Sequence, residues 1–322
     1  MRAAIIRSPG RIEIDDVPLP EPGPGQVRVR LEGCGVCASN LPVWEGRPWF
    51  EYPFAPGAPG HEGWGVVDAM GENVTSLRMG DSLALLSDHA YAEYDLADAD
   101  AVVKRPAGGE SGPFPAEPLG CAMNVFRRSG IERGGTVAII GVGFLGALLV
   151  QLASAAGARV IAVSRRPFAL DAARRGGAEE TFALDDRHEV ARRINELTGG
   201  EGCDVVIEAT GLQEPLDLAA DVTRIRGRLV IAGYHQDGLR TVNMQHWNWR
   251  GLDVINAHER DPAVYIEGIR QGIAAVAEGR LRPQPLYTTI CSLDRLGEAL
   301  EQTRRRPDGF MKALVLMNGE RA

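Results

Sequence analysis

The sequence predicts an α/β protein in which a doubly wound parallel sheet is inserted into a discontinuous, β-rich domain. The central part of the chain alternates short apolar runs with helical stretches, which is the order of parallel βαβ units. The part before it has short alternating runs and many turn glycines, and one more apolar run follows at 312–317. We therefore expect a β-rich domain over residues 1–120 and 258–322, and a parallel α/β domain over 121–257.

The composition is that of an ordinary folded protein of about two domains. The chain has 322 residues, of which 44% are hydrophobic and 24% are charged, and this argues against a disordered chain. The net charge of −8 argues against a nucleic-acid partner, since such a partner needs a basic face. No run approaches the ~18 apolar residues that span a membrane, and the N-terminal apolar run is too short for a signal peptide. We expect a cytoplasmic protein without a membrane partner.

The expected strands follow from local patterns. Residues 26–31 alternate apolar and polar side chains, which is the period of a half-buried strand. Four buried apolar strands are expected in the central segment, at 136–141, 159–163, 204–209 and 228–233. Residues 144–156 have helical character, and Gly157 is a suitable end for that helix.

The five cysteines do not suggest a disulfide framework, because they are few, odd in number and scattered. They are Cys34, Cys37, Cys121, Cys203 and Cys291. Cys34 and Cys37 form a C-x-x-C, for which a redox pair is one interpretation. A zinc ribbon would need a second C-x-x-C, and the sequence has none.

Gly141, Gly143 and Gly146 form a G-x-G-x-x-G between an expected strand and an expected helix. This is the context in which the motif binds a dinucleotide. Gly141 would permit the tight turn, Gly143 would let the backbone approach the pyrophosphate, and Gly146 would allow close packing of helix and strand. The helix N-terminus would offer N–H groups to the phosphates. The motif predicts a Rossmann domain with a bound dinucleotide; the alternative is a glycine-rich turn without a ligand.

The residues after the second strand bear on which dinucleotide binds. NAD-binding domains usually place Asp or Glu there, to accept a hydrogen bond from the ribose 2′-hydroxyl. This chain has Ser164, Arg165 and Arg166 instead. A serine and two arginines can bind a 2′-phosphate, which a carboxylate would repel. The segment favours NADP(H) over NAD(H), unless both arginines form a solvated face.

A second motif, G-H-E-x-x-G-x5-G-x-x-V, runs from Gly60 to Val74, and the segment 35–40 containing Cys37 precedes it. Together they resemble the signature of zinc-dependent medium-chain dehydrogenases, the family of alcohol and polyol dehydrogenases. The resemblance extends over essentially the whole chain. It implies a GroES-like catalytic domain around the inserted Rossmann domain, and one catalytic zinc per chain.

By this resemblance, Cys37 and His61 are ligands of the catalytic zinc, for which a thiolate and a neutral imidazole are suitable donors. The third ligand falls where a helix begins before the Rossmann domain. The E-P-L sequence at Glu117 is similar to the polyol dehydrogenase branch, where the glutamate fills that position, and we take Glu117 as the third ligand. Cys121, one helical turn later, is the alternative; otherwise it would pack against the nicotinamide.

The resemblance also implies two catalytic residues. Ser39 matches the hydroxyl that passes the proton, and Glu62 would enter the zinc shell transiently or orient a neighbour. The sequence departs from the family in having Asn40 where Asp is common, which removes a charge beside the ligands. It also has no histidine shortly after Ser39 to continue a proton relay, and it lacks the four-cysteine lobe that binds a structural zinc.

The expected function is therefore hydride transfer between NADP(H) and a secondary alcohol, polyol or cyclitol, or the corresponding carbonyl compound. Two alternatives remain at this point. One is a zinc-free quinone or enoyl reductase of the same superfamily, and the other is a non-catalytic NADPH-binding protein.

The aromatic residues of two segments have no clear assignment. Trp44, Trp49 and Phe50 lie between the first two expected ligands, and Trp247 and Trp249 precede an expected strand. They could form a substrate wall, part of the core or a dimer contact.

The quaternary state follows from the expected strand at 252–256, which would lie at the end of the parallel sheet. Edge strands need cover, and by the family resemblance this one pairs across a two-fold axis. We expect a homodimer or a homotetramer.

Overall fold

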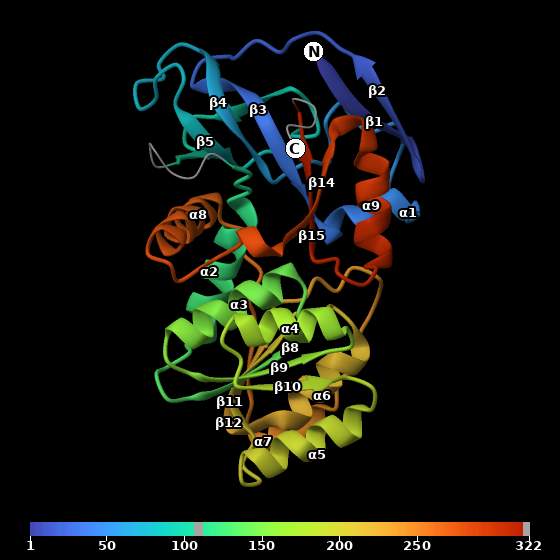
Figure 1. Ribbon diagram of the computed structural model, residues 1–322, viewed down its shortest axis with the longest axis vertical. Coiled ribbons are helices and arrows are strands. Elements are labelled where there is room, and N and C mark those ends of the chain that lie inside the picture. Colours follow the sequence, from blue (N-terminus) through green and yellow to red (C-terminus); the bar gives the residue numbers. More distant parts are fainter. Residues whose placement is uncertain (106–111, 318–322) are drawn as a thin grey trace. The chain divides into compact units, whose positions relative to one another are not determined.

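The computed structural model describes residues 1–105 and 112–317 (Figure 1). The chain divides into two compact units. The first unit comprises Met1–Gly120, Ile269–Ile273 and Gln284–Ala322, and the second comprises Cys121–Gly268 and Ala274–Pro283. Residues 258–268 and 274–283, which the sequence analysis assigned to the β-rich domain, group with the second unit.

Two helices explain this difference, because each contributes residues to both units. They are α2 (Glu117–Ser129) and α8 (Pro262–Ala277). Within the first unit, a Cβ on Gly272 would approach the Cβ of Leu119 to 2.7 Å; within the second, a Cβ on Gly268 would come equally close to Asn124. Helix α8 therefore packs closely along α2 at both glycines. Because α2 has residues in both units, α8 has residues in both units too.

The first unit is built on a seven-stranded sheet of order β14-β15-β3-β4-β5-β7, in which β6 also pairs with β3. Its strands are β3 (Gln26–Val36), β4 (Gly63–Met70), β5 (Ser82–Leu85), β6 (Tyr94–Asp98), β7 (Val102–Lys104), β14 (Tyr287–Ser292) and β15 (Lys312–Leu316). Strands β14 and β15 are parallel, and the other pairs are antiparallel. A separate hairpin consists of β1 (Arg2–Ser8) and β2 (Arg11–Asp16).

Short helices complete the first unit. They are α1 (Leu41–Glu45), α9 (Leu296–Arg305) and the 3₁₀ helices η1 (Ala38–Asn40), η2 (Gln284–Leu286) and η3 (Leu293–Arg295).

The alternation predicted at 26–31 is confirmed within the longer strand β3. Val27, Val29 and Leu31 are buried in the core of the first unit, while the residues between them are partly exposed. A Cβ on Gly65 of β4 would overlap the carbonyl oxygen of Arg30. Glycine at that position therefore lets β3 and β4 approach closely.

The second unit is a six-stranded, fully parallel sheet of order β10-β9-β8-β11-β12-β13. Its strands are β8 (Thr136–Ile140), β9 (Arg159–Ser164), β10 (Glu180–Ala183), β11 (Cys203–Glu208), β12 (Thr223–Ile231) and β13 (Asp253–Asn256). This is the doubly wound order, which reverses between β8 and β11, and such sheets bind ligands at the carboxyl ends of the strands near the reversal. The predicted parallel strands are confirmed, although β12 begins earlier than expected.

Helices cover both faces of the parallel sheet (Figure 1). They are α3 (Phe144–Ala155), α4 (Pro167–Arg175), α5 (Arg187–Leu197), α6 (Gln213–Val222) and α7 (Met244–Arg250). Helices α3 and α4 pack against β8, β9 and β10, while α6 packs against β8, β11 and β12 with α5 beside it. The predicted helix after the glycine motif is confirmed as α3.

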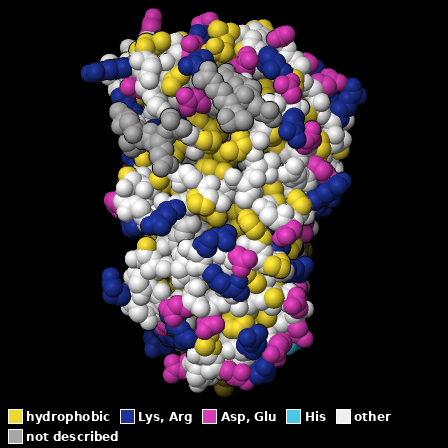
Figure 2. Space-filling view, viewed as in Figure 1, with side chains coloured by type: hydrophobic (Ala, Val, Ile, Leu, Met, Phe, Trp, Pro, Cys, Tyr) yellow, Lys and Arg dark blue, Asp and Glu magenta, His cyan; other side chains and the backbone are white. Residues whose placement is uncertain are grey.

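The surface gives two further facts. Among the described residues, no helix combines the length and the apolar character needed to cross a membrane. Figure 2 shows one face of the molecule, on which basic and acidic side chains are interspersed.

Candidate metal and cofactor sites

Cys37, His61 and Glu62 bring a thiol, an imidazole and a carboxylate together in the first unit. Their ligand atoms all lie within 4.8 Å of one another. Cys37 follows β3, and His61 and Glu62 directly precede β4. Because β3 and β4 are antiparallel neighbours, the end of one strand meets the start of the other at the same edge of the sheet. Strand pairing therefore builds this cluster from residues distant in sequence.

The imidazole of His61 is oriented by the backbone. Its Nδ1 lies 2.9 Å from the carbonyl oxygen of Pro59, and its Nε2 lies 3.4 Å from Oγ of Ser39. A carbonyl oxygen only accepts, so Nδ1 carries a proton and Nε2 is the nitrogen that could bind a metal. Asn40 donates to the same carbonyl at 3.0 Å, and its Oδ1 accepts from the buried Tyr91 at 2.8 Å. Asn40 thus supports His61 through Pro59, without the charge of an aspartate.

The surroundings of His61 favour a positive charge. Burial lowers the pKa of His61, but a hydrogen bond with Cys37 and the charges of Cys37, Glu117 and Glu62 outweigh burial. The pKa of His61 is therefore raised well above its ordinary value. A metal cation bound at Nε2 would displace the proton and meet the same negative surroundings.

Glu62 is a buried carboxylate with a buried cation beside it. Lys312 at the start of β15 places Nζ 2.6 Å from the carboxylate, and both side chains are at most 5% exposed. Burial lowers the pKa of Lys312, but the charges of Glu62 and Cys37 outweigh it, and the pKa of Lys312 is raised overall. An unpaired buried carboxylate would be costly, so the ion pair with Lys312 compensates for the burial of Glu62 within the cluster.

The carboxylate of Glu62 could also serve as a metal ligand. It is buried, and Nζ of Lys312 lies 2.6 Å from both Oε1 and Oε2. A buried anionic oxygen next to a thiol and an imidazole is a suitable donor for a divalent cation. The residues present therefore fit zinc.

The sequence analysis did not single out Lys312, because 250 positions separate it from Glu62. Only the pairing of β15 with β3, and of β3 with β4, brings the two together. The signal available in the sequence was a lysine at the start of an otherwise apolar strand.

Glu117 is the first residue of α2 and is buried. Its charge raises the pKa of both His61 and Lys312, so it acts on the cluster. It is not among the described residues whose ligand atoms lie within 4.8 Å of one another. The structure thus offers two carboxylates to a metal held by Cys37 and His61: Glu62 in the cluster and Glu117 beside it.

The remaining cysteines near this motif are engaged elsewhere. Cys34 is fully buried on β3, where burial raises its thiol pKa well above the ordinary value, and it forms no disulfide with Cys37. Within the C-x-x-C, Cys34 therefore belongs to the core and Cys37 to the cluster. In the second unit, Sγ of Cys121 lies 2.7 Å from Oη of Tyr265.

The glycine-rich turn lies between β8 and α3, at the reversal of strand order. Gly141 has a φ of 104°, a backbone conformation that residues with a side chain rarely adopt. A Cβ there would overlap Thr210. A Cβ on Gly146 would overlap the carbonyl oxygen of Gly141, so α3 packs directly on the turn. A Cβ on Gly143 would meet nothing within 4 Å. The open space at Gly143 suits a close approach of phosphates.

The last residue of β9 and the two residues that follow it lie next to this turn. Ser164 is buried, and its Oγ accepts a hydrogen bond from the backbone N–H of Arg166 at 3.3 Å. The guanidinium of Arg166 donates to the carbonyl oxygen of Val142, within the turn, at 3.3 Å. Arg165 forms an ion pair of 2.9 Å with Glu214 of α6. The two arginines therefore point to different partners.

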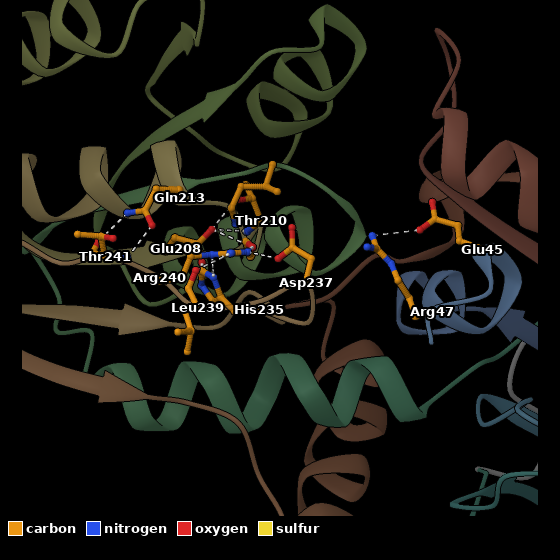
Figure 3. A network of polar contacts seen from close by, with 12 residues as sticks. Glu45, Arg47, Glu208, Thr210, Gln213, His235, Asp237, Leu239, Arg240 and Thr241 are labelled. Carbon is orange, nitrogen blue, oxygen red and sulfur yellow. Dashed lines mark hydrogen bonds and ion pairs between the residues drawn. The ribbon is translucent and has the colours of Figure 1, made fainter. Parts of the chain in front are cut away.

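The buried carboxylate of Glu208 accepts hydrogen bonds from the loops that follow β11 and β12 (Figure 3). Glu208 accepts from the backbone N–H of Thr210 and from Nε2 of His235, at 2.6 and 3.0 Å. Nε of Arg240 donates to Nδ1 of His235 at 2.9 Å. His235 must therefore accept at Nδ1 and donate at Nε2, which makes it a neutral link between Arg240 and Glu208. Sequence patterns did not reveal this network, since its members are separated by a strand and a helix.

The aromatic residues fall into two groups. Trp44 and Trp247 pack against the cores of the first and second unit, respectively. Trp49 is 58% exposed and Trp249 is 87% exposed. The ring of Phe50 lies 6.0 Å from that of Trp49, so the loop between Cys37 and His61 carries two adjacent aromatic rings, of which that of Trp49 is exposed.

Comparisons with known proteins agree with this arrangement. Residues 23–107 match the alcohol dehydrogenase GroES-like domain, and residues 145–271 match the zinc-binding dehydrogenase domain. The (R,R)-butanediol dehydrogenase of Neisseria gonorrhoeae is 27% identical over 99% of this chain and 100% of its own. An alcohol dehydrogenase of Rhizobium meliloti is 32% identical over 72% of this chain and 77% of its own.

A solved structure gives a similar result. A Sinorhizobium meliloti protein, described as a zinc-binding dehydrogenase bound to NADP, shares 26% identity with this chain. Its TM-score is 0.82, and the match covers 98% of both chains.

The network around Glu208 leads to a stability prediction. Glu208→Ala removes the acceptor shared by the N–H groups of Thr210 and His235, and should lower the free energy of unfolding by about 3 kcal/mol or more. Asp237→Ala removes a partly exposed partner of Arg240 and should cost less than about 1 kcal/mol. Urea unfolding of both variants measures this difference, and equal midpoints would contradict the structural role of Glu208.

Proposed function

This chain belongs to the zinc-dependent medium-chain dehydrogenase family, and from that membership we propose that it transfers hydride between NADP(H) and a secondary alcohol, polyol or cyclitol, or the corresponding carbonyl compound. The observation that carries the proposal is the cluster of Cys37, His61 and Glu62, in which a thiol, an oriented imidazole and a buried carboxylate lie together. Relatives named for alcohol and butanediol support the substrate class. The enzyme is an oxidoreductase in either direction of the reaction.

In this proposal, Cys37, His61 and Glu117 hold one zinc ion per chain. Zinc would polarise the substrate oxygen and lower the pKa of an alcohol. Ser39, whose Oγ lies 3.4 Å from Nε2 of His61, would accept the hydroxyl proton and pass it towards solvent. Glu62, which forms a buried ion pair with Lys312, would enter the zinc shell transiently or orient a neighbouring residue.

The cofactor side of the proposal rests on the second unit. The turn at Gly141, Gly143 and Gly146 would receive the pyrophosphate, and Cys121 would lie against the nicotinamide. Ser164, Arg165 and Arg166 would bind the 2′-phosphate. The NADP-bound neighbour supports this choice of cofactor.

The alternatives require a different site. A zinc-free quinone or enoyl reductase would have no use for a thiol and an imidazole beside two buried carboxylates. A non-catalytic NADPH-binding protein would have no use for Ser39 at the imidazole. The thiolate that zinc requires is favoured in a reducing compartment, so we propose the cytoplasm.

We also propose that β13 pairs with β13 of a second copy of the chain. It is the last strand of the parallel sheet, and in the described part of the chain it pairs only with β12. Val254 on this strand is 39% exposed, and Ile225 of β12 is 63% exposed. Exposed apolar side chains at an unpaired edge are covered in stable proteins.

The metal ligands can be tested by two substitutions. Glu117→Gln keeps the size of the side chain but removes its charge, and should lower zinc occupancy and reduce kcat at least about tenfold. Cys121→Ser should leave zinc bound. Metal analysis and steady-state kinetics measure both effects. If Cys121→Ser removes the metal and Glu117→Gln does not, Cys121 is the ligand. A native protein that binds no added zinc but turns over substrate would favour the zinc-free reductase.

The cofactor preference can be tested by binding. We expect NADPH to bind at least about tenfold more tightly than NADH, since one or two charge-assisted contacts contribute roughly 1.5–3 kcal/mol each. Replacing both Arg165 and Arg166 by Ser should remove this difference and leave NADH affinity almost unchanged. Equal affinities of the native protein for both cofactors would show that the arginines are only a solvated face.

The quaternary state can be tested by light scattering. At micromolar concentration we expect the mass of a dimer or a tetramer, because the edge of β13 is apolar and unpaired. Val254→Lys should shift the mass towards the monomer, since edge lysines oppose strand pairing. A monomeric mass for the native protein would contradict the proposal.

A further inference from the structure

Arg165 and Glu214 come from strands on opposite sides of β8. Arg165 directly follows β9, and Glu214 lies in the first turn of α6, which follows β11. The sheet order is β9-β8-β11, so their ion pair of 2.9 Å spans the carboxyl end of β8. The glycine-rich turn begins at that end. The pair therefore lies across the crevice in which doubly wound sheets bind a dinucleotide.

This ion pair contributes little to the fold. The side chains of Arg165 and Glu214 are 59% and 48% exposed, and exposed pairs of this kind add little stability. The pair would matter instead for the binding of a charged ligand. A guanidinium that forms an ion pair with a carboxylate must break or share that ion pair before it binds a phosphate. The carboxylate also repels a phosphate dianion but accepts a hydrogen bond from a neutral hydroxyl.

Arg166 contacts the glycine-rich turn. Its Nη2 donates to the carbonyl oxygen of Val142, which is a neutral acceptor. A phosphate could take the place of this carbonyl oxygen without competing against a charge on it. For Arg165, in contrast, a phosphate would have to compete with the carboxylate of Glu214.

We propose that Glu214 is a specificity-determining residue of the cofactor site. From across β8, it supplies the carboxylate that is missing at the end of β9, and by pairing with Arg165 it weakens the binding of a 2′-phosphate. The same carboxylate does not weaken the binding of the unphosphorylated cofactor, which has a ribose 2′-hydroxyl. The preference of the native chain for NADP(H) is therefore smaller than its two arginines alone would give. This inference rests on the proposed binding of the 2′-phosphate by Arg165 and Arg166.

The test is Glu214→Gln in the full chain, with the dissociation constants of NADPH and NADH measured by nicotinamide fluorescence. NADPH should bind roughly three- to fivefold more tightly, and NADH affinity should stay the same or fall slightly. The gain should shrink when Arg165 is replaced by Ser in the same protein, because it depends on the released guanidinium. Thermal unfolding should be almost unchanged, since the pair is exposed.

Glu179→Gln is the matched control. It removes the same charge from another exposed pair, with Arg159 at 3.7 Å, near the amino ends of β9 and β10. This variant should leave the ratio of the two affinities unchanged. An equal gain in NADPH affinity from Glu179→Gln would show a general charge effect and overturn the proposal.

The outcomes separate the inference from the proposed function. If Glu214→Gln changes neither affinity, while loss of both arginines lowers NADPH affinity, the role of Glu214 is wrong and the arginine site stands. If loss of both arginines also leaves NADPH affinity unchanged, the proposed 2′-phosphate site fails, and the role of Glu214 fails with it. A full gain that persists without Arg165 would show that pairing is not the cause.

Discussion

The buried ion pair between Glu62 and Lys312 is the interaction on which the metal site depends. It holds the carboxylate of Glu62 inside the first unit, next to Cys37 and His61, where burial of an unpaired carboxylate would be costly. The pair requires β15, β3 and β4 to be neighbours in one sheet. The pairing of β3 with β4 also brings Cys37 and His61 together. The order of strands in the sheet therefore determines both the ligand cluster and the ion pair.

The second unit uses a buried carboxylate in a different way. Within residues 1–105 and 112–317, Glu208 is held by N–H groups of the loop after β11 and by the neutral His235 of the loop after β12. These loops lie beside the glycine-rich turn, because Thr210 occupies the space next to Gly141. The polar network thus fixes the carboxyl edge of the parallel sheet, where the strand order opens a crevice for a cofactor.

Local patterns predicted the elements and the motif residues, but not their partners. The glycine turn and strand β3 follow from periodicity and neighbouring residues, which are properties of short segments, whereas the helix start at Glu117 was implied by the family resemblance. The pairs of Glu62 with Lys312 and of Arg165 with Glu214 depend on strand order, which periodicity does not encode. The division of α8 between the two units was missed for the same reason, since it follows from packing along α2.

X-ray absorption spectroscopy at the zinc edge tests the central claim most directly. The account predicts one sulfur at about 2.3 Å and nitrogen or oxygen ligands at about 2.0–2.2 Å, because Cys37 is the one thiolate among the proposed ligands. Replacement of Cys37 by Ser should remove the sulfur signal. Two sulfur ligands in the native protein, or a sulfur signal that persists without Cys37, would contradict a site built from Cys37, His61 and a carboxylate.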